Sequence, residues 1–176
     1  MTFQTSRQTA ARSMDAWNWL AVPTLTCLML TLILALPVRV FGLVPPEPIF
    51  LMVPAFVWAV IRPSILPPII LMVSGLLLDI LWGAPLGLWG FSLLFGYAGV
   101  LASRSFASGQ GQSMNWVWYA ITCLIVELTA YLVTLIDSHA APSVIGAFWQ
   151  WAVTAALYPF AHQLIERFED ADVRFK

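Results

Sequence analysis

Long apolar segments separated by very short polar connections dominate this chain. If about 20 residues make one membrane crossing, the chain offers six such segments, at 17–38, 48–61, 66–82, 85–103, 115–136 and 145–165. Connections such as 62–65 and 83–84 are too short to hold a soluble domain. The pattern predicts an all-α fold, a polytopic integral membrane bundle of about six transmembrane helices.

The scarcity of charge supports the same fold class. The 176 residues include only 8 basic and 9 acidic side chains, and the mean hydropathy is +0.84. A soluble domain carries roughly 25% charged residues, so we expect much of this surface to face the lipid bilayer. The net charge is −1 and there is no basic run, which gives a nucleic-acid partner no electrostatic support.

The second apolar segment is the weakest of the six. Fourteen residues, 48–61, reach only about 21 Å as a helix, against a hydrocarbon core of about 30 Å. Pro54 also removes a backbone donor from the segment. We expect a tilted, broken or re-entrant helix that its neighbours support.

The distribution of basic residues predicts the orientation. With a cytoplasmic N-terminus and six crossings, only Arg39 lies outside, and seven basic residues lie inside: Arg7, Arg12, Arg62, Arg104, Arg167, Arg174 and Lys176. This asymmetry is the one that the positive-inside rule favours. The predicted organisation is a cytoplasmic segment 1–16, a transmembrane domain 17–165 and a cytoplasmic tail 166–176.

Asp79 lies toward the outer end of the segment 66–82, one turn before Gly83. Arg39, at the outer end of the first segment, is a possible ion-pair partner. Asp79 is also placed to accept backbone N–H bonds from the start of the next helix, where Pro85 suits the first turn and the helix dipole favours an anion. A structural clamp at this hairpin is the favoured interpretation, and a direct contact with a partner is the alternative.

Glu127 stands near the middle of the segment 115–136. An ionisable group at such a depth costs roughly 2.5–3.5 kcal/mol on insertion scales. Tyr131 and Thr134 share its helix face at spacings of four and seven residues. Two interpretations stay open: a proton or substrate site, or a protonated or hydrogen-bonded residue that joins helices.

The sequence gives no indication of a catalytic, metal or cofactor site. His139 and His162 share no metal-ligand spacing with Asp, Glu or Cys. There is no nucleophile–base pair and no phosphate-binding loop. We therefore expect no enzyme, no catalytic residue, no metal and no cofactor.

The stretch 75–87, GLLLDILWGAPLG, resembles the central signature of the bacterial rod shape-determining protein MreD family. In that signature, a span ending G-L-x-x-D-x-x-x-G is followed by x-x-L/P-G and the next span. Other residues fit the same pattern along nearly the whole chain: Pro48, Trp58, Arg62, Pro63, Tyr97 and Pro159. The polar start before Trp17 and the carboxyl group of Glu127 have no match in the family.

The resemblance implies a multi-pass protein of the bacterial inner membrane and a fold similar to the substrate-binding S components of energy-coupling-factor transporters. Its implied role is a non-enzymatic scaffold in cell elongation, needed for rod shape and lateral peptidoglycan synthesis. The implied partners are MreC, most directly, with MreB, RodA and the elongation transpeptidase. The hairpin residues implied to shape the partner-binding face are Gly75, Asp79, Gly83, Pro85 and Gly87.

Two other function classes stay open. The main alternative is the substrate-binding membrane component of a small-solute, vitamin-type transporter. Such proteins usually carry an Ala-x-x-x-Ala face on the first helix, whereas this first segment offers only Ala21 and Ala35. The second is an intramembrane enzyme, which lacks paired catalytic groups at matching depth.

Overall fold

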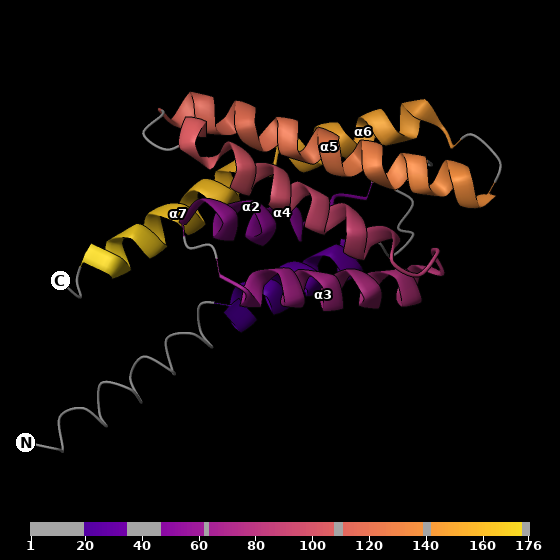
Figure 1. Ribbon diagram of the computed structural model, residues 1–176, viewed down its shortest axis with the longest axis horizontal. Helices are drawn as coiled ribbons and strands as arrows, with labels where there is room; N and C mark the ends of the chain where they lie inside the picture. The colour runs from indigo at the N-terminus through magenta and orange to yellow at the C-terminus, as the bar shows by residue number, and fades with distance from the viewer. Residues whose placement is uncertain (1–19, 35–46, 62–63, 108–110, 139–141, 174–176) are drawn as a thin grey trace, which may run out of the picture.

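The computed structural model describes residues 20–34, 47–61, 64–107, 111–138 and 142–173 (Figure 1). All regular secondary structure in these ranges is helical, so the all-α prediction is confirmed. A first helix, Leu20–Leu34, precedes six others: α2 (Met52–Ile61), α3 (Leu66–Trp82), α4 (Leu88–Ala107), α5 (Gln112–Ser138), α6 (Val144–Ala155) and α7 (Tyr158–Val173).

The helices form a bundle with α4 and α2 in its middle (Figure 1). The helix α4 packs against α2, α3 and α5, while α2 also packs against α7 and α6 lies against α5. In the view of Figure 1, α5 and α6 run along the upper edge, and α3 and the first helix (indigo) along the lower edge. The core therefore sits around α2, in which every residue from Met52 to Ala59 is buried.

The helix α3 covers the same residues as the third predicted segment, Leu66–Trp82. Proline occupies its first positions, where a missing N–H costs nothing because the first turn has no partner for it. Gly83 ends it in the left-handed conformation, at φ 64°, a conformation that glycine adopts without steric cost. The sequence therefore contains both of the signals that define this helix.

The second predicted span is much shorter as a helix than the sequence suggests. At 10 residues, α2 reaches about 15 Å and does not cross a bilayer by itself. Pro54 lies in its first turn and breaks no intrahelical hydrogen bond. The backbone N–H of Ile49 reaches Thr154, well inside the sixth segment, so α2 begins within the bundle rather than at its end.

Two further boundaries differ from the prediction. The fourth helix begins at Leu88 rather than at Pro85, because the positive φ of Gly87, 97°, does not fit a right-handed helix. The sixth segment is interrupted, with α6 ending at Ala155 and α7 starting at Tyr158. Pro159 explains the interruption, since it has no N–H to donate to the carbonyl of Ala155.

Two of the described helical segments are long and apolar enough to cross a membrane, Gln112–Ser138 and the interrupted Val144–Glu166. The helices Leu20–Leu34, Met52–Ile61 and Leu66–Trp82 are apolar but shorter. The prediction of six crossings, with both termini on the cytoplasmic side, stays a prediction. Arg39 and Arg62, on which that orientation depends, lie outside the described residues.

Candidate functional site

The hairpin between α3 and α4 is built around the backbone and side chain of Asp79. The carbonyl oxygen of Asp79 accepts hydrogen bonds from the N–H of Gly83, which caps α3, and from the N–H of Ala84 at 2.9 Å. This pattern closes the last turn of the helix and satisfies a carbonyl that would otherwise lack a partner. The chain then reverses direction within a few residues.

The side chain of Asp79 fastens the next helix to this turn. Its Oδ2 accepts from the N–H of Gly87 at 2.8 Å, and its Oδ1 accepts from the N–H of Trp89 at 3.0 Å. The residue is completely buried, with 0% exposure. The carboxylate thus satisfies free donors at the start of α4, where the helix dipole also favours a negative charge. The sequence predicted hydrogen bonds of this kind.

Pro85 supports the turn from outside the helix. Its carbonyl oxygen accepts from the N–H of Leu88 at 3.0 Å, and Gly87 in turn accepts from Phe91 at 2.8 Å. The indole rings of Trp82 and Trp89 close the hairpin in an edge-to-face contact, with centroids 5.7 Å apart. Arg39, the predicted ion-pair partner of Asp79, lies outside the described residues.

Gly75 allows α3 and α4 to approach at backbone distance. A Cβ added at Gly75 would lie 2.4 Å from the nitrogen and 2.5 Å from the Cα of Gly90, which no real side chain tolerates. The reason that this position holds glycine is therefore steric. Gly75, Asp79, Gly83, Pro85 and Gly87 form one unit, which we call the Asp79 hairpin.

The intramembrane polar residues of α5 lie outside the Asp79 hairpin. Glu127 is half-buried, and among the described residues its carboxyl group has no hydrogen bond or ion pair. The hydroxyl group of Tyr131 donates to the carbonyl of Pro142 at 3.3 Å, whereas Thr134 donates to the carbonyl of Ala130 in its own helix at 2.9 Å. Of the three, only Tyr131 is seen to join α5 to another segment.

The interruption between α6 and α7 gathers polar contacts that the sequence did not predict. The carbonyl of Thr154 accepts from the Tyr119 hydroxyl group at 3.3 Å, and the carbonyl of Ala155 accepts from the indole Nε1 of Trp116 at 3.2 Å. These donors from α5 satisfy carbonyls at the point where the helix ladder is broken. No interruption was predicted here from the sequence, although Pro159 is a local signal for one, and no local pattern indicates the donors from α5.

The same interruption anchors the start of α2. The Thr154 Oγ1 accepts from the N–H of Ile49 at 3.2 Å, and the Thr31 Oγ1 of the first helix accepts from the N–H of Phe50 at 3.1 Å. Both threonines are buried. The free donors at the start of α2 therefore bond to the chain's own side chains and not to a ligand.

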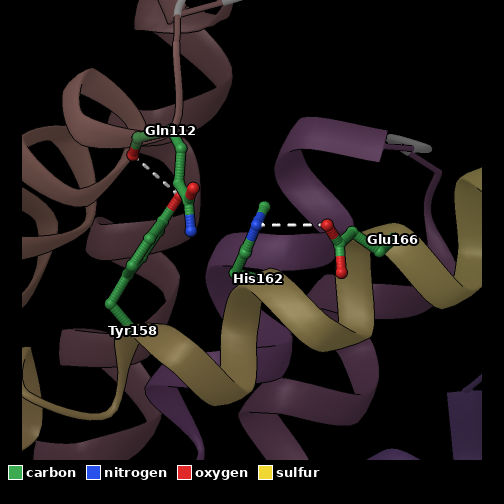
Figure 2. A network of polar contacts seen from close by, with 4 residues as sticks. All are labelled: Gln112, Tyr158, His162 and Glu166. Atoms are coloured by element: carbon green, nitrogen blue, oxygen red, sulfur yellow. Dashed lines mark hydrogen bonds and ion pairs between the residues drawn. The ribbon is translucent and has the colours of Figure 1, made fainter.

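Figure 2 shows a second polar group, at the start of α7. The Tyr158 hydroxyl group donates to the carbonyl of Gln112 at 3.1 Å, and His162 Nε2 lies 3.2 Å from Glu166 Oε1 (Figure 2). The rings of Tyr158 and His162 stack with centroids 5.9 Å apart. No group of three or more His, Cys, Asp or Glu residues able to hold a metal ion occurs in the part of the chain that the structure describes.

One recess of about 290 Å³ opens between the first helix, α2 and α7. Most of its lining is apolar, and its polar side chains are Thr26, Cys27 and Gln163. The hydroxyl group of Thr26 bonds to the carbonyls of Val22 and Pro23 within its own helix. The recess therefore offers few of the converging polar groups that a polar small molecule needs.

Comparison with known proteins adds no assignment. No protein-family model, no curated protein and no solved structure matches this chain.

Proposed function

We propose that this protein is a multi-pass membrane scaffold of the bacterial cell-elongation complex, similar to the MreD family. In this role it binds MreC and, through the complex, MreB, RodA and the elongation transpeptidase. It carries out no reaction itself. The observation that carries the proposal is the Asp79 hairpin, in which the residues of the family-like stretch 75–87 form one hydrogen-bonded and closely packed unit.

The membrane placement has its own support. In the apolar stretches of Gln112–Ser138 and Val144–Glu166, only 28% of the residues are buried by the rest of the protein. A core helix of a soluble protein would bury most of such a stretch. Large apolar side chains also lie exposed around the bundle, including Ile69 at 54%, Val73 at 53%, Phe95 at 60% and Leu132 at 54%. A lipid environment accommodates all of these surfaces.

We further propose six crossings with both termini in the cytoplasm, in which α2 is the half-length helix of the second crossing, 48–61. Reporter fusions test this orientation. A cytoplasm-active reporter after Lys176 and a periplasm-active reporter in the 139–141 connection should both be active. Activity of the opposite reporters at these two sites would overturn the orientation.

Depletion in the native rod-shaped host tests the functional class. We expect the cells to round up, and we expect the tagged protein to co-purify MreC. Unchanged cell shape after full depletion would overturn the proposed function. Binding of vitamins to the detergent-solubilised full chain tests the alternative. Tight binding would favour a transporter S component.

Surface substitutions at the two ends of α3 test the hairpin as the partner face. Leu86, in the turn between α3 and α4, is 75% exposed, and Ile65 at the opposite end of α3 is 81% exposed. We expect Leu86→Asp to lower the recovery of MreC several-fold and Ile65→Asp to leave it unchanged, with both variants at wild-type abundance. Equal recovery with both variants would show that MreC binds elsewhere.

A further inference from the structure

Glu127 lies on the face of α5 that runs along α6. Two hydrogen bonds mark this face: Trp151 Nε1 of α6 donates to the carbonyl of Ala120 at 3.0 Å, and the Tyr131 hydroxyl group donates at 3.3 Å to the carbonyl of Pro142, just before α6. Positions 120, 127 and 131 follow the i, i+7, i+11 spacing of one helical stripe. Glu127 therefore lies between the two cross-helix bonds, near the middle of the 27-residue helix.

The surroundings of Glu127 supply no partner among the described residues. The neighbours of Glu127 along α5 on the outer side of this face are apolar and exposed, with Leu124 at 42% and Leu128 at 52%. A carboxyl group among such neighbours within a bilayer costs free energy until a donor satisfies it. Asp79, by contrast, has both oxygens satisfied within the chain.

We propose that the α5–α6 face around Glu127 binds a transmembrane helix of another protein that carries a side-chain hydrogen-bond donor, an amide or a cation, at mid-membrane depth. The proposal rests on the membrane placement given above and not on the elongation role. The donor forms a hydrogen bond with the carboxyl group of Glu127, and the exposed leucines nearby provide the packing surface.

The shape of the surface favours a helix over a solute. The exposed apolar side chains of α5 form a stripe next to that of Glu127, and this stripe runs for several turns: Val117, Ile121, Leu124, Leu128, Leu132 and Ile136. A stripe of this length matches a second helix that packs along α5, because packed helices share contacts over many turns. The recess of about 290 Å³ has a different lining, which does not include Glu127.

The chemistry favours a different chain over a second copy. In a two-fold symmetric dimer, the same patch faces itself. Such a contact centred on Glu127 would bring two carboxyl groups together, and when both are ionised their like charges oppose each other and neither has a proton to donate. A helix with an amide or cationic side chain supplies the missing donor directly.

The full-length protein in lipid vesicles tests the proposal with synthetic membrane-spanning helices of leucine and alanine. One probe carries a single central asparagine, and the matched probe carries leucine there. Energy transfer between labelled protein and labelled probe reports their association. We expect the asparagine probe to bind the wild type about tenfold more tightly than the leucine probe, the range of one interhelical hydrogen bond in model peptides.

Three variants test whether the preference for the asparagine probe depends on the carboxyl group at position 127. Glu127→Gln keeps an acceptor and should keep the preference, whereas Glu127→Leu should abolish it. The double variant Glu127→Leu/Val73→Glu moves the carboxyl group to a lipid-facing position of α3 that is 53% exposed, and it should not restore the preference. The melting temperature of each variant in vesicles serves as the folding control.

Four outcomes would overturn the proposal. They are equal binding of both probes to the wild type, a preference that survives in Glu127→Leu, restoration by the relocated carboxyl group, and self-association of the wild type through Glu127 before any probe is added. The vesicles contain no elongation protein, so each of these outcomes is separate from the result of the depletion experiment in cells.

Discussion

Asp79 and Glu127 are both carboxyl groups within apolar helices, and the fold treats them differently. Asp79 is 0% exposed and accepts two backbone hydrogen bonds that fasten α4 to α3. Glu127 is half-buried on α5, and the described residues leave it without a hydrogen bond or ion pair. A carboxyl group with its donors in the same chain stabilises the fold. One without them is expected to serve a contact outside the chain.

The largest loss of stability should follow Asp79→Ala. The change removes two hydrogen bonds to a charged acceptor and leaves the N–H groups of Gly87 and Trp89 buried without a partner. We expect a loss of about 3 kcal/mol or more, measured as unfolding of the purified protein in mixed micelles with increasing denaturing detergent. Asp79→Asn should lose about half as much, since its amide oxygen still accepts one bond.

Leu77→Ala is the matched control for Asp79→Ala, because Leu77 lies on the same helix and is 43% exposed. If Asp79→Ala unfolded at the same detergent fraction as Leu77→Ala, the two backbone hydrogen bonds would contribute nothing measurable. The comparison with Glu127 would then have no basis.

The next effect concerns the close approach behind the hairpin. Gly75→Ala places a Cβ within 2.4 Å of the backbone nitrogen of Gly90, so the two helices must separate. Overpacking of this kind costs about 2 kcal/mol. Gly99→Ala is the control, because its Cβ would meet only Ile125 Cδ1, at 3.8 Å. In mixed micelles, Gly75→Ala should unfold at a lower fraction of denaturing detergent than Gly99→Ala. Equal stabilities would contradict the close packing of α3 against α4 at Gly75.

Local signals explain which parts of the fold the sequence predicts. The third predicted segment has the bounds of α3, and the local signals for those bounds are the prolines at its start and Gly83 at its end. The hydrogen bonds of Asp79 were predicted because donor and acceptor are 8 and 10 residues apart. At that separation, the chain's own turn brings the groups together.

The rest depends on contacts between distant segments. The bond from Ile49 to Thr154 joins residues 105 apart in the chain, and that from Phe50 to Thr31 joins residues 19 apart. No periodicity in the sequence indicates such pairs. The early start predicted for the second span failed for this reason, since residues before Met52 are held by side chains of other helices.

A smaller effect should follow Tyr119→Phe at the interruption between α6 and α7. The change removes a donor to the carbonyl of Thr154, which also accepts from the N–H of Leu157, and it keeps the ring, which is 0% exposed. We expect a loss of about 1 kcal/mol in the free energy of unfolding. Tyr131→Phe removes a bond of the same length from a half-buried site and should lose less. A larger loss in Tyr131→Phe would show that the bond from Tyr131 to Pro142 stabilises the fold more than the bond from Tyr119 to Thr154.

The smallest effect on the isolated protein should follow Glu127→Leu. The change removes no hydrogen bond made by the described residues, and it replaces a polar group with one that suits its apolar neighbours. We expect the free energy of unfolding in mixed micelles to stay within about 0.5 kcal/mol of the wild type, or to rise. A loss as large as that of Asp79→Ala would mean that a donor within the chain already satisfies Glu127. The carboxyl group would then belong to the fold, and the contrast with Asp79 would disappear. An unchanged stability together with lost binding of the asparagine probe is the one combination that assigns Glu127 to a partner.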